Sequence, residues 1–103
     1  MTKPIRYHRD ARVDYREAAQ WYKERRDGLG HQFVDKVAET LREIAAMPHA
    51  GLLVADGGRD QVIRRRRVQG FSHYVIYRET GSAIRVLAVA HTSREPRYWL
   101  GRV

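Results

Sequence analysis

The sequence predicts an α+β fold, in which an antiparallel hairpin of two helices packs on one face of a small antiparallel sheet of three further strands. Three observations support this prediction. A short apolar–polar run at residues 5–8 indicates an N-terminal strand, apolar residues then recur at helical spacing as far as Pro48, and the pattern becomes strand-like from residue 62. The 103 residues fit one domain, which we expect to span 1–103.

Two helices are expected between the first strand and Pro48. Asp10 can cap the first helix and Gly28 can end it, while the second helix is expected after Gly30 and ends before Pro48. The apolar stripe of the first helix consists of Ala11, Tyr15, Ala18 and Tyr22. The stripe of the second consists of Phe33, Val37, Leu41 and Ile44. The short connection between the helices predicts an antiparallel hairpin.

Three strands are expected after a loop at residues 49–60, which contains Gly57 and Gly58. They lie at 62–68, 72–77 and 83–90. The last run is the most apolar in the chain, so we expect a central strand buried on both faces, with Arg85 at one exposed position. Pro96 can then start one short C-terminal helical turn.

Positive charge is concentrated in the second half of the chain. The net charge is +8, of which residues 1–58 contribute about +1 and residues 59–103 about +7. Such a one-sided surface suits nucleic acid or an acidic protein partner, and solubility alone is the plain alternative. The absence of cysteine excludes disulfides and thiolate metal sites, and the five histidines are scattered, so neither a metal nor a cofactor is expected. No apolar run is long enough to cross a membrane, so the expected compartment is the cytoplasm.

The first candidate site is the run Arg64–Arg67. Side chains alternate along a strand, so Arg64 and Arg66 share one face, and Arg65 and Arg67 share the other. Burying both pairs in the core would cost too much desolvation, so at least one pair should lie in a groove or face a partner. The alternative is a solvated edge strand whose charges discourage aggregation.

The second candidate site is the tail set His91, Arg94, Arg97, Tyr98 and Trp99. The arginines can bind phosphate, the aromatic rings can stack on bases, and His91 or Tyr98 can move a proton, as metal-free RNA cleavage requires. In the alternative interpretation, Tyr98 and Trp99 pack over the helices and His91 is hydrogen-bonded at the strand end. We favour this structural role for Trp99 and a functional role for Arg94.

These segments resemble the RelE/ParE superfamily of toxins over about residues 5 to 102. The resemblance rests on the ordered set WY, LG-x-x-F, the proline that ends the second helix, and AVAH-x-x-R-x-P-x-YW. It implies a toxin neutralised by an antitoxin. The resemblance implies a ParD-like partner, and the net charge of +8 predicts that this partner is acidic. We expect the antitoxin to cover exposed apolar surface near Trp21, Tyr22, Leu52 and Leu53.

The hairpin and AVAH motifs look more like the ParE branch, which poisons DNA gyrase by binding. This implies that the chain is not an enzyme and that target binding involves Arg64, Arg66, Arg94 and Arg97. The first alternative is a RelE-like, ribosome-dependent mRNA endoribonuclease, in which Arg94 and Tyr98 resemble catalytic residues and His91 could assist. No lysine follows Lys36, and arginine cannot readily act as an acid, which favours binding over catalysis. The second alternative is a non-toxic binding module.

Overall fold

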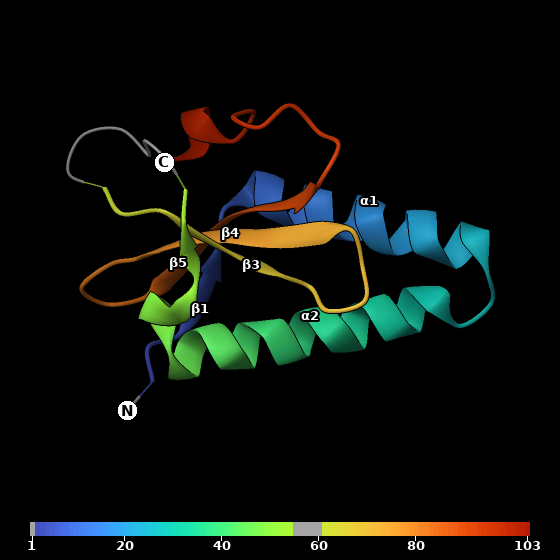
Figure 1. The fold of residues 1–103 in the computed structure, drawn as a ribbon, viewed down its shortest axis with the longest axis horizontal. Coiled ribbons are helices and arrows are strands. Elements are labelled where there is room, and N and C mark those ends of the chain that lie inside the picture. The colour runs from blue at the N-terminus through green and yellow to red at the C-terminus, as the bar shows by residue number, and fades with distance from the viewer. Residues whose placement is uncertain (1, 55–60) are drawn as a thin grey trace.

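The computed structural model describes residues 2–54 and 61–103 and has the predicted α+β architecture (Figure 1). Residues 55–60 of the expected loop, including Gly57 and Gly58, lie outside the described residues. The elements in chain order are β1 (Ile5–Tyr7), α1 (Arg9–Arg25), α2 (Leu29–Ala46), the 3₁₀ turn η1 (Pro48–Ala50), β2 (Leu52–Leu53), β3 (Arg64–Arg67), β4 (His73–Glu79), β5 (Ile84–His91) and the 3₁₀ turn η2 (Leu100–Arg102). Within these residues, neither helix is long and apolar enough to cross a membrane.

The strands form one five-stranded mixed sheet in the order β1-β5-β4-β3-β2. β5, β4 and β3 are antiparallel neighbours, as expected, and β2 adds to β3 in the same sense, whereas β1 pairs with β5 in parallel. The short strand β2 was not predicted, because two residues are too few to show a period of two. Figure 1 shows α1 and α2 running antiparallel and joined by a tight turn.

Both faces of the sheet are covered by apolar side chains. The face toward the helices carries the larger cluster, which contains Ala11, Ala18, Tyr22, Phe33, Val37, Ile44, Val68, Phe71, Val75, Tyr77, Ile84, Val86 and Val89. The opposite face carries a smaller cluster, which contains Ile63, Ile76, Leu87, Ala88, Ala90 and Trp99. The second cluster means that the C-terminal segment acts as a cover for the sheet face that the helices leave open.

A bulge in β5 allows this strand to supply both clusters. Ile76 of β4 pairs with Ala88 while Tyr77 pairs with Val86, so Leu87 has no partner across the ladder. The extra residue shifts the alternation of side chains by one position. Val86 and Val89 therefore face the helices, whereas Leu87 and Ala88 face the other way.

The first residue of each helix differs from the prediction. α1 begins at Arg9, because the N-cap is His8 rather than Asp10; the His8 ring accepts a hydrogen bond from the Asp10 amide at 3.1 Å. α2 begins at Leu29, directly after Gly28, so it starts before Gly30. Gly28 has a φ of +80°, a conformation that favours glycine.

Candidate functional site

The C-terminal segment is anchored to the sheet by one buried carboxylate, that of Asp14 in α1. Its Oδ2 atom accepts hydrogen bonds from the Tyr98 hydroxyl at 2.9 Å and from Arg102 Nη1 at 2.7 Å. The side chain is only 5% exposed, and Arg94 Nη1 lies 3.8 Å from its Oδ1. Asp14 therefore joins α1 to three side chains of residues 94–102.

The ion pair of Asp14 with Arg102 also caps the part of the β5 edge that β1 does not reach. β1 pairs with β5 only as far as the register of Tyr7 with Val86. Beyond that point the Val89 amide donates to Asp14 Oδ2 at 3.2 Å, and Arg102 Nη1 donates to the Leu87 carbonyl at 3.0 Å. Two side chains thus supply the hydrogen bonds that a longer first strand would have made.

The Tyr98 ring contacts the guanidinium groups of both arginines that face Asp14, Arg94 and Arg102. The guanidinium carbon of Arg94 is 3.8 Å from the centre of the Tyr98 ring, and that of Arg102 is 4.9 Å from it. Burial and the neighbouring Asp14 carboxylate raise the pKa of Tyr98 well above its usual range, despite the opposing effect of the arginines. The Tyr98 hydroxyl is therefore a hydrogen-bond donor to Asp14 and a poor source of a transferable proton near neutral pH.

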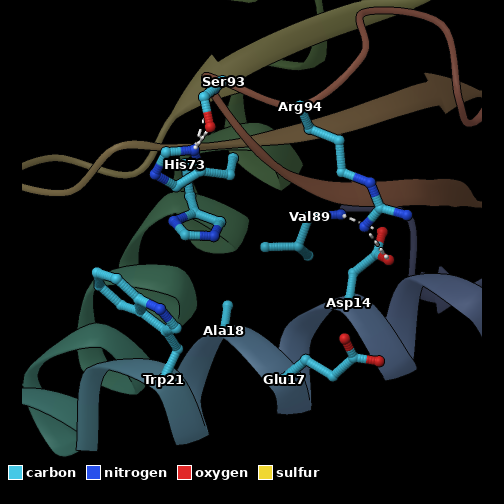
Figure 2. A pocket seen from close by; sticks show the side chains of 9 residues that line it. Asp14, Glu17, Ala18, Trp21, His73, Val89, Ser93 and Arg94 are labelled. Carbon is cyan, nitrogen blue, oxygen red and sulfur yellow. Dashed lines mark hydrogen bonds and ion pairs between the residues drawn. The ribbon is translucent and has the colours of Figure 1, made fainter. Parts of the chain in front are cut away.

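A pocket of about 390 Å³ lies between α1 and the end of β5. Figure 2 shows Asp14, Glu17, Ala18 and Trp21 along the helix, with Arg94 reaching Asp14 from the opposite wall. The charged side chains Asp14, Glu17 and Arg94 therefore gather at one end of the pocket, and Trp21 lies at the other end.

His91 borders this pocket, and its Nδ1 atom is already engaged. The backbone amide of Ser93 donates to Nδ1 at 3.0 Å, and the Ser93 hydroxyl lies 2.7 Å from the same atom. The neutral ring therefore carries its proton on Nε2. The ring packs against His73, with ring centres 5.0 Å apart.

His73 is a buried histidine that belongs to the core. Its Nδ1 atom is 3.0 Å from the Tyr22 hydroxyl, which also accepts a hydrogen bond from the Ser72 amide at 3.4 Å. Burial, together with the nearby His91, lowers the pKa of His73 to about 4, although Asp14 acts in the opposite direction. His73 is therefore neutral at physiological pH and has a structural role.

The structure divides the four arginines of β3 between the two faces of the sheet. Arg64 and Arg66 lie on the helix side, where Arg64 donates to the Gly51 carbonyl at 2.9 Å and Arg66 lies 3.5 Å from Glu43. These two residues were expected to bind the target together with Arg94, but they line neither of the two pockets that Arg94 lines. Arg65 lies on the other face.

Arg65 contacts a second pocket, on the face away from the helices. This pocket is also lined by Tyr74, Arg94 and Tyr98. The guanidinium carbon of Arg65 lies 4.6 Å from the centre of the Tyr74 ring. Arg97, which is exposed, belongs to the same C-terminal segment. Arg65 and Arg94 therefore line one pocket, and Arg97 is a further exposed cation of the tail.

The aromatic residues proposed as site residues differ in exposure. Trp99 is 1% exposed and lies in the core, as we favoured, but it covers the sheet face opposite the helices rather than the helices themselves. Tyr22 is 7% exposed, so the expectation that it forms part of an exposed surface is wrong; it packs on Phe33 and Phe71. Trp21, in contrast, is 45% exposed.

Leu52 and Leu53 are 64% and 65% exposed on the edge strand β2. They lie at the opposite edge of the sheet from β1, next to β3. Trp21 belongs to α1, which packs against β5. The exposed apolar residues proposed for antitoxin binding therefore fall into two separate areas.

The central role of Asp14 was not predicted from the sequence. A signal was present, because Asp14 falls three and four residues from Ala11 and Ala18 on the apolar stripe, and a carboxylate in such a position needs a buried partner. No group of three or more metal-ligating side chains occurs among residues 2–54 and 61–103.

The helical hairpin on one face of a mixed sheet, with a basic C-terminal segment closing the other face, is consistent with a ParE-like fold. The chain belongs to the ParE toxin family of the type II toxin–antitoxin system parDE, whose sequence model matches residues 5–96. A solved structure described as the chromosomal ParDE TA system from P. aeruginosa is similar in fold, with a TM-score of 0.69 at 14% identity. The match covers 87% of this chain and 96% of that chain. No curated protein matches the sequence.

Proposed function

We propose that this ParE-family toxin acts by binding and inhibiting DNA gyrase, and that an acidic antitoxin neutralises it in the cytoplasm. The observation that carries the proposal is the bonding of the tail residues. The hydroxyl of Tyr98 is bound to Asp14, and Nδ1 of His91 is bound to Ser93. The Tyr98 hydroxyl and one of the two ring nitrogens of His91 are therefore already engaged in hydrogen bonds, which favours binding over catalysis.

The proposed target surface is the exposed cationic part of the tail together with its neighbour on β3. Arg94 and Arg97 are exposed, and Arg65 shares a pocket with Arg94. Arginine suits this role because its planar fork can bind carboxylates in a bidentate manner. Arg64 and Arg66 are not included, since their guanidinium groups contact Gly51 and Glu43.

The antitoxin is proposed to cover Trp21 at one area and Leu52 and Leu53 at the other. Exposed apolar side chains of this size favour burial against a partner, and an acidic chain complements the net charge of +8. Because the two areas are separate, the antitoxin segment must extend along the toxin or supply two elements. Such an antitoxin would cover Trp21 on the helical hairpin and Leu52 and Leu53 on the sheet edge at the same time.

A supercoiling assay with purified gyrase tests the toxin proposal. The unmodified chain should inhibit supercoiling, and Arg65→Gln/Arg97→Gln should raise the half-inhibitory concentration by about tenfold, equivalent to about 1.4 kcal/mol. Arg16→Gln/Arg42→Gln is the matched control, because it removes two exposed helix charges far along the chain from the tail. Unaffected gyrase, combined with mRNA cleavage in translating ribosomes that Tyr98→Phe abolishes, would overturn the proposal.

A further inference from the structure

Three arginines lie side by side across three neighbouring strands of the sheet. The register pairs Arg6 of β1 with Arg85 of β5, and Arg85 with Arg78 of β4. Adjacent strands are about 4.7 to 4.9 Å apart, and directly paired side chains point to the same side. We call this set the arginine row (Arg6, Arg85 and Arg78). It is separate from the run Arg64–Arg67 and from the tail arginines.

The arginine row lies on the face of the sheet that the helices do not cover. Ile5 and Tyr7 pack on the helix-side cluster, so Arg6, between them, points away from it. Ile84 and Val86 also pack on the helix-side cluster, so Arg85, between them, points away from the helices. Tyr77 belongs to the same cluster, so the next residue of β4, Arg78, points away from the helices as well. Arg6 is exposed, and the other two are half-buried.

Within the part of the chain that the structure describes, no acidic side chain forms an ion pair with the row. The neighbouring Glu79 lies on the other face of β4 and is bound by Lys3 at 3.1 Å and by His49 at 2.8 Å. The Nε atom of Arg78 is buried and has no hydrogen-bond partner. Like charges that face each other directly across strands destabilise a sheet, so this arrangement would gain from an anion shared by all three guanidinium groups.

We propose that the arginine row binds the phosphodiester backbone of nucleic acid. Guanidinium groups bind phosphate oxygens through charge-assisted, forked hydrogen bonds. A row of them across the sheet can contact successive phosphates without contacting base edges, so the binding is independent of sequence.

The surroundings of the row favour nucleic acid over a protein partner. Protein interfaces have an apolar core, whereas phosphate contacts need only cations. In the described residues, the exposed large apolar side chains belong to α1, α2, β2 and η2 or to Met47 and Val62, and none belongs to β1, β4 or β5. Val62 shares a pocket with Arg78 at one end of the row, but the three strands that carry the row supply charge and no exposed large apolar side chain of their own.

The salt dependence of DNA binding tests this inference, measured by fluorescence anisotropy with a labelled duplex and no gyrase present. A plot of log affinity against log salt, between about 50 and 200 mM, has a slope of about −0.9 for each phosphate contacted. Arg6→Gln/Arg78→Gln/Arg85→Gln should make the slope shallower by about 2 to 3 and weaken binding by more than tenfold at low salt. The triple lysine variant should retain most of the slope, because it keeps the three charges.

The control is Arg16→Gln/Arg26→Gln/Arg42→Gln, which removes the same net charge from exposed positions of the hairpin. An equal loss of slope in the control would overturn the inference, because the overall charge of +8 would then explain the binding. Stronger binding to polyglutamate than to the duplex, or no binding to the duplex, would also overturn it. If the triple glutamine variant does not fold, the single substitution Arg6→Gln, at an exposed position, should still make the slope shallower by about 1. A negative result leaves the gyrase proposal untouched, because that assay measures enzyme inhibition.

Discussion

Asp14 is a buried carboxylate whose two oxygens serve a backbone amide, a tyrosine and two arginines. A buried charge is costly unless it is paired and hydrogen-bonded, and Asp14 meets both conditions. Its partners come from β5 and from residues 94–102, which lie far from it in sequence. A single carboxylate therefore fixes the position of the C-terminal segment relative to the helix.

We expect Asp14→Asn to destabilise the protein by about 3 kcal/mol, because it leaves the guanidinium group of Arg102 buried without its counter-ion. Chemical denaturation measures this loss. Asp10→Asn is the matched control, since its side chain is 50% exposed and should change stability by less than about 0.5 kcal/mol. A double variant with Arg102→Met should recover part of the loss, and equal effects of the two single variants would contradict the role of Asp14.

His73 gives the stability of the protein a dependence on pH. Its pKa is about 4 in the folded chain, against an ordinary value of 6.5. Between these two values the unfolded chain binds more protons, so the free energy of unfolding falls as the pH drops through this window. The total loss is about 3 kcal/mol.

His73→Gln removes this titration. The difference in free energy of unfolding between the two proteins should therefore change between pH 7 and pH 4, while the other titrating groups cancel. A constant difference across this range would show that His73 does not sense pH.

At the scale of elements, the helices were easier to predict than the strands. The stripe containing Phe33, Val37 and Ile44 correctly identified the buried face of α2, because helical periodicity extends over five turns. The pairing of β1 with β5 could not be predicted, since it depends on contacts between residues about 80 positions apart. The bulge at Leu87 was also invisible, because a run of apolar residues shows no alternation that a bulge could interrupt.

The turn between the helices depends on Gly28, and we expect Gly28→Ala to cost about 1 kcal/mol. A Cβ atom placed there would meet no other atom within 4 Å, so the cost comes from the positive φ alone. Gly81→Ala is the matched control, because its site is equally open and its φ is not positive. Thermal denaturation of both variants compares them, and equal melting temperatures would rule out backbone strain as the cause.

At the scale of the whole molecule, the basic half of the chain could be located from the sequence, but the way its arginines group in space could not. Strand alternation correctly divided the run Arg64–Arg67 into two pairs. Which pair shares a face with Arg94 depends on where the C-terminal segment packs, and this segment is fixed by Asp14 from the first half of the chain. The arginine row was likewise hidden, because Arg6 and Arg85 become neighbours only through the parallel pairing of β1 with β5.

The bulge at Leu87 also has a consequence for how the gene can change. Leu87 is the extra residue, and the strand keeps its register with β4 on either side of it, with Val86 opposite Tyr77 and Ala88 opposite Ile76. Loss of the Leu87 codon would restore simple alternation while Val89 stays opposite Val75, with its amide beside Asp14. The gene can therefore lose this codon without a change of register, whereas gain of a codon beside it would turn the side chains on one side of the insertion to the other face of the sheet.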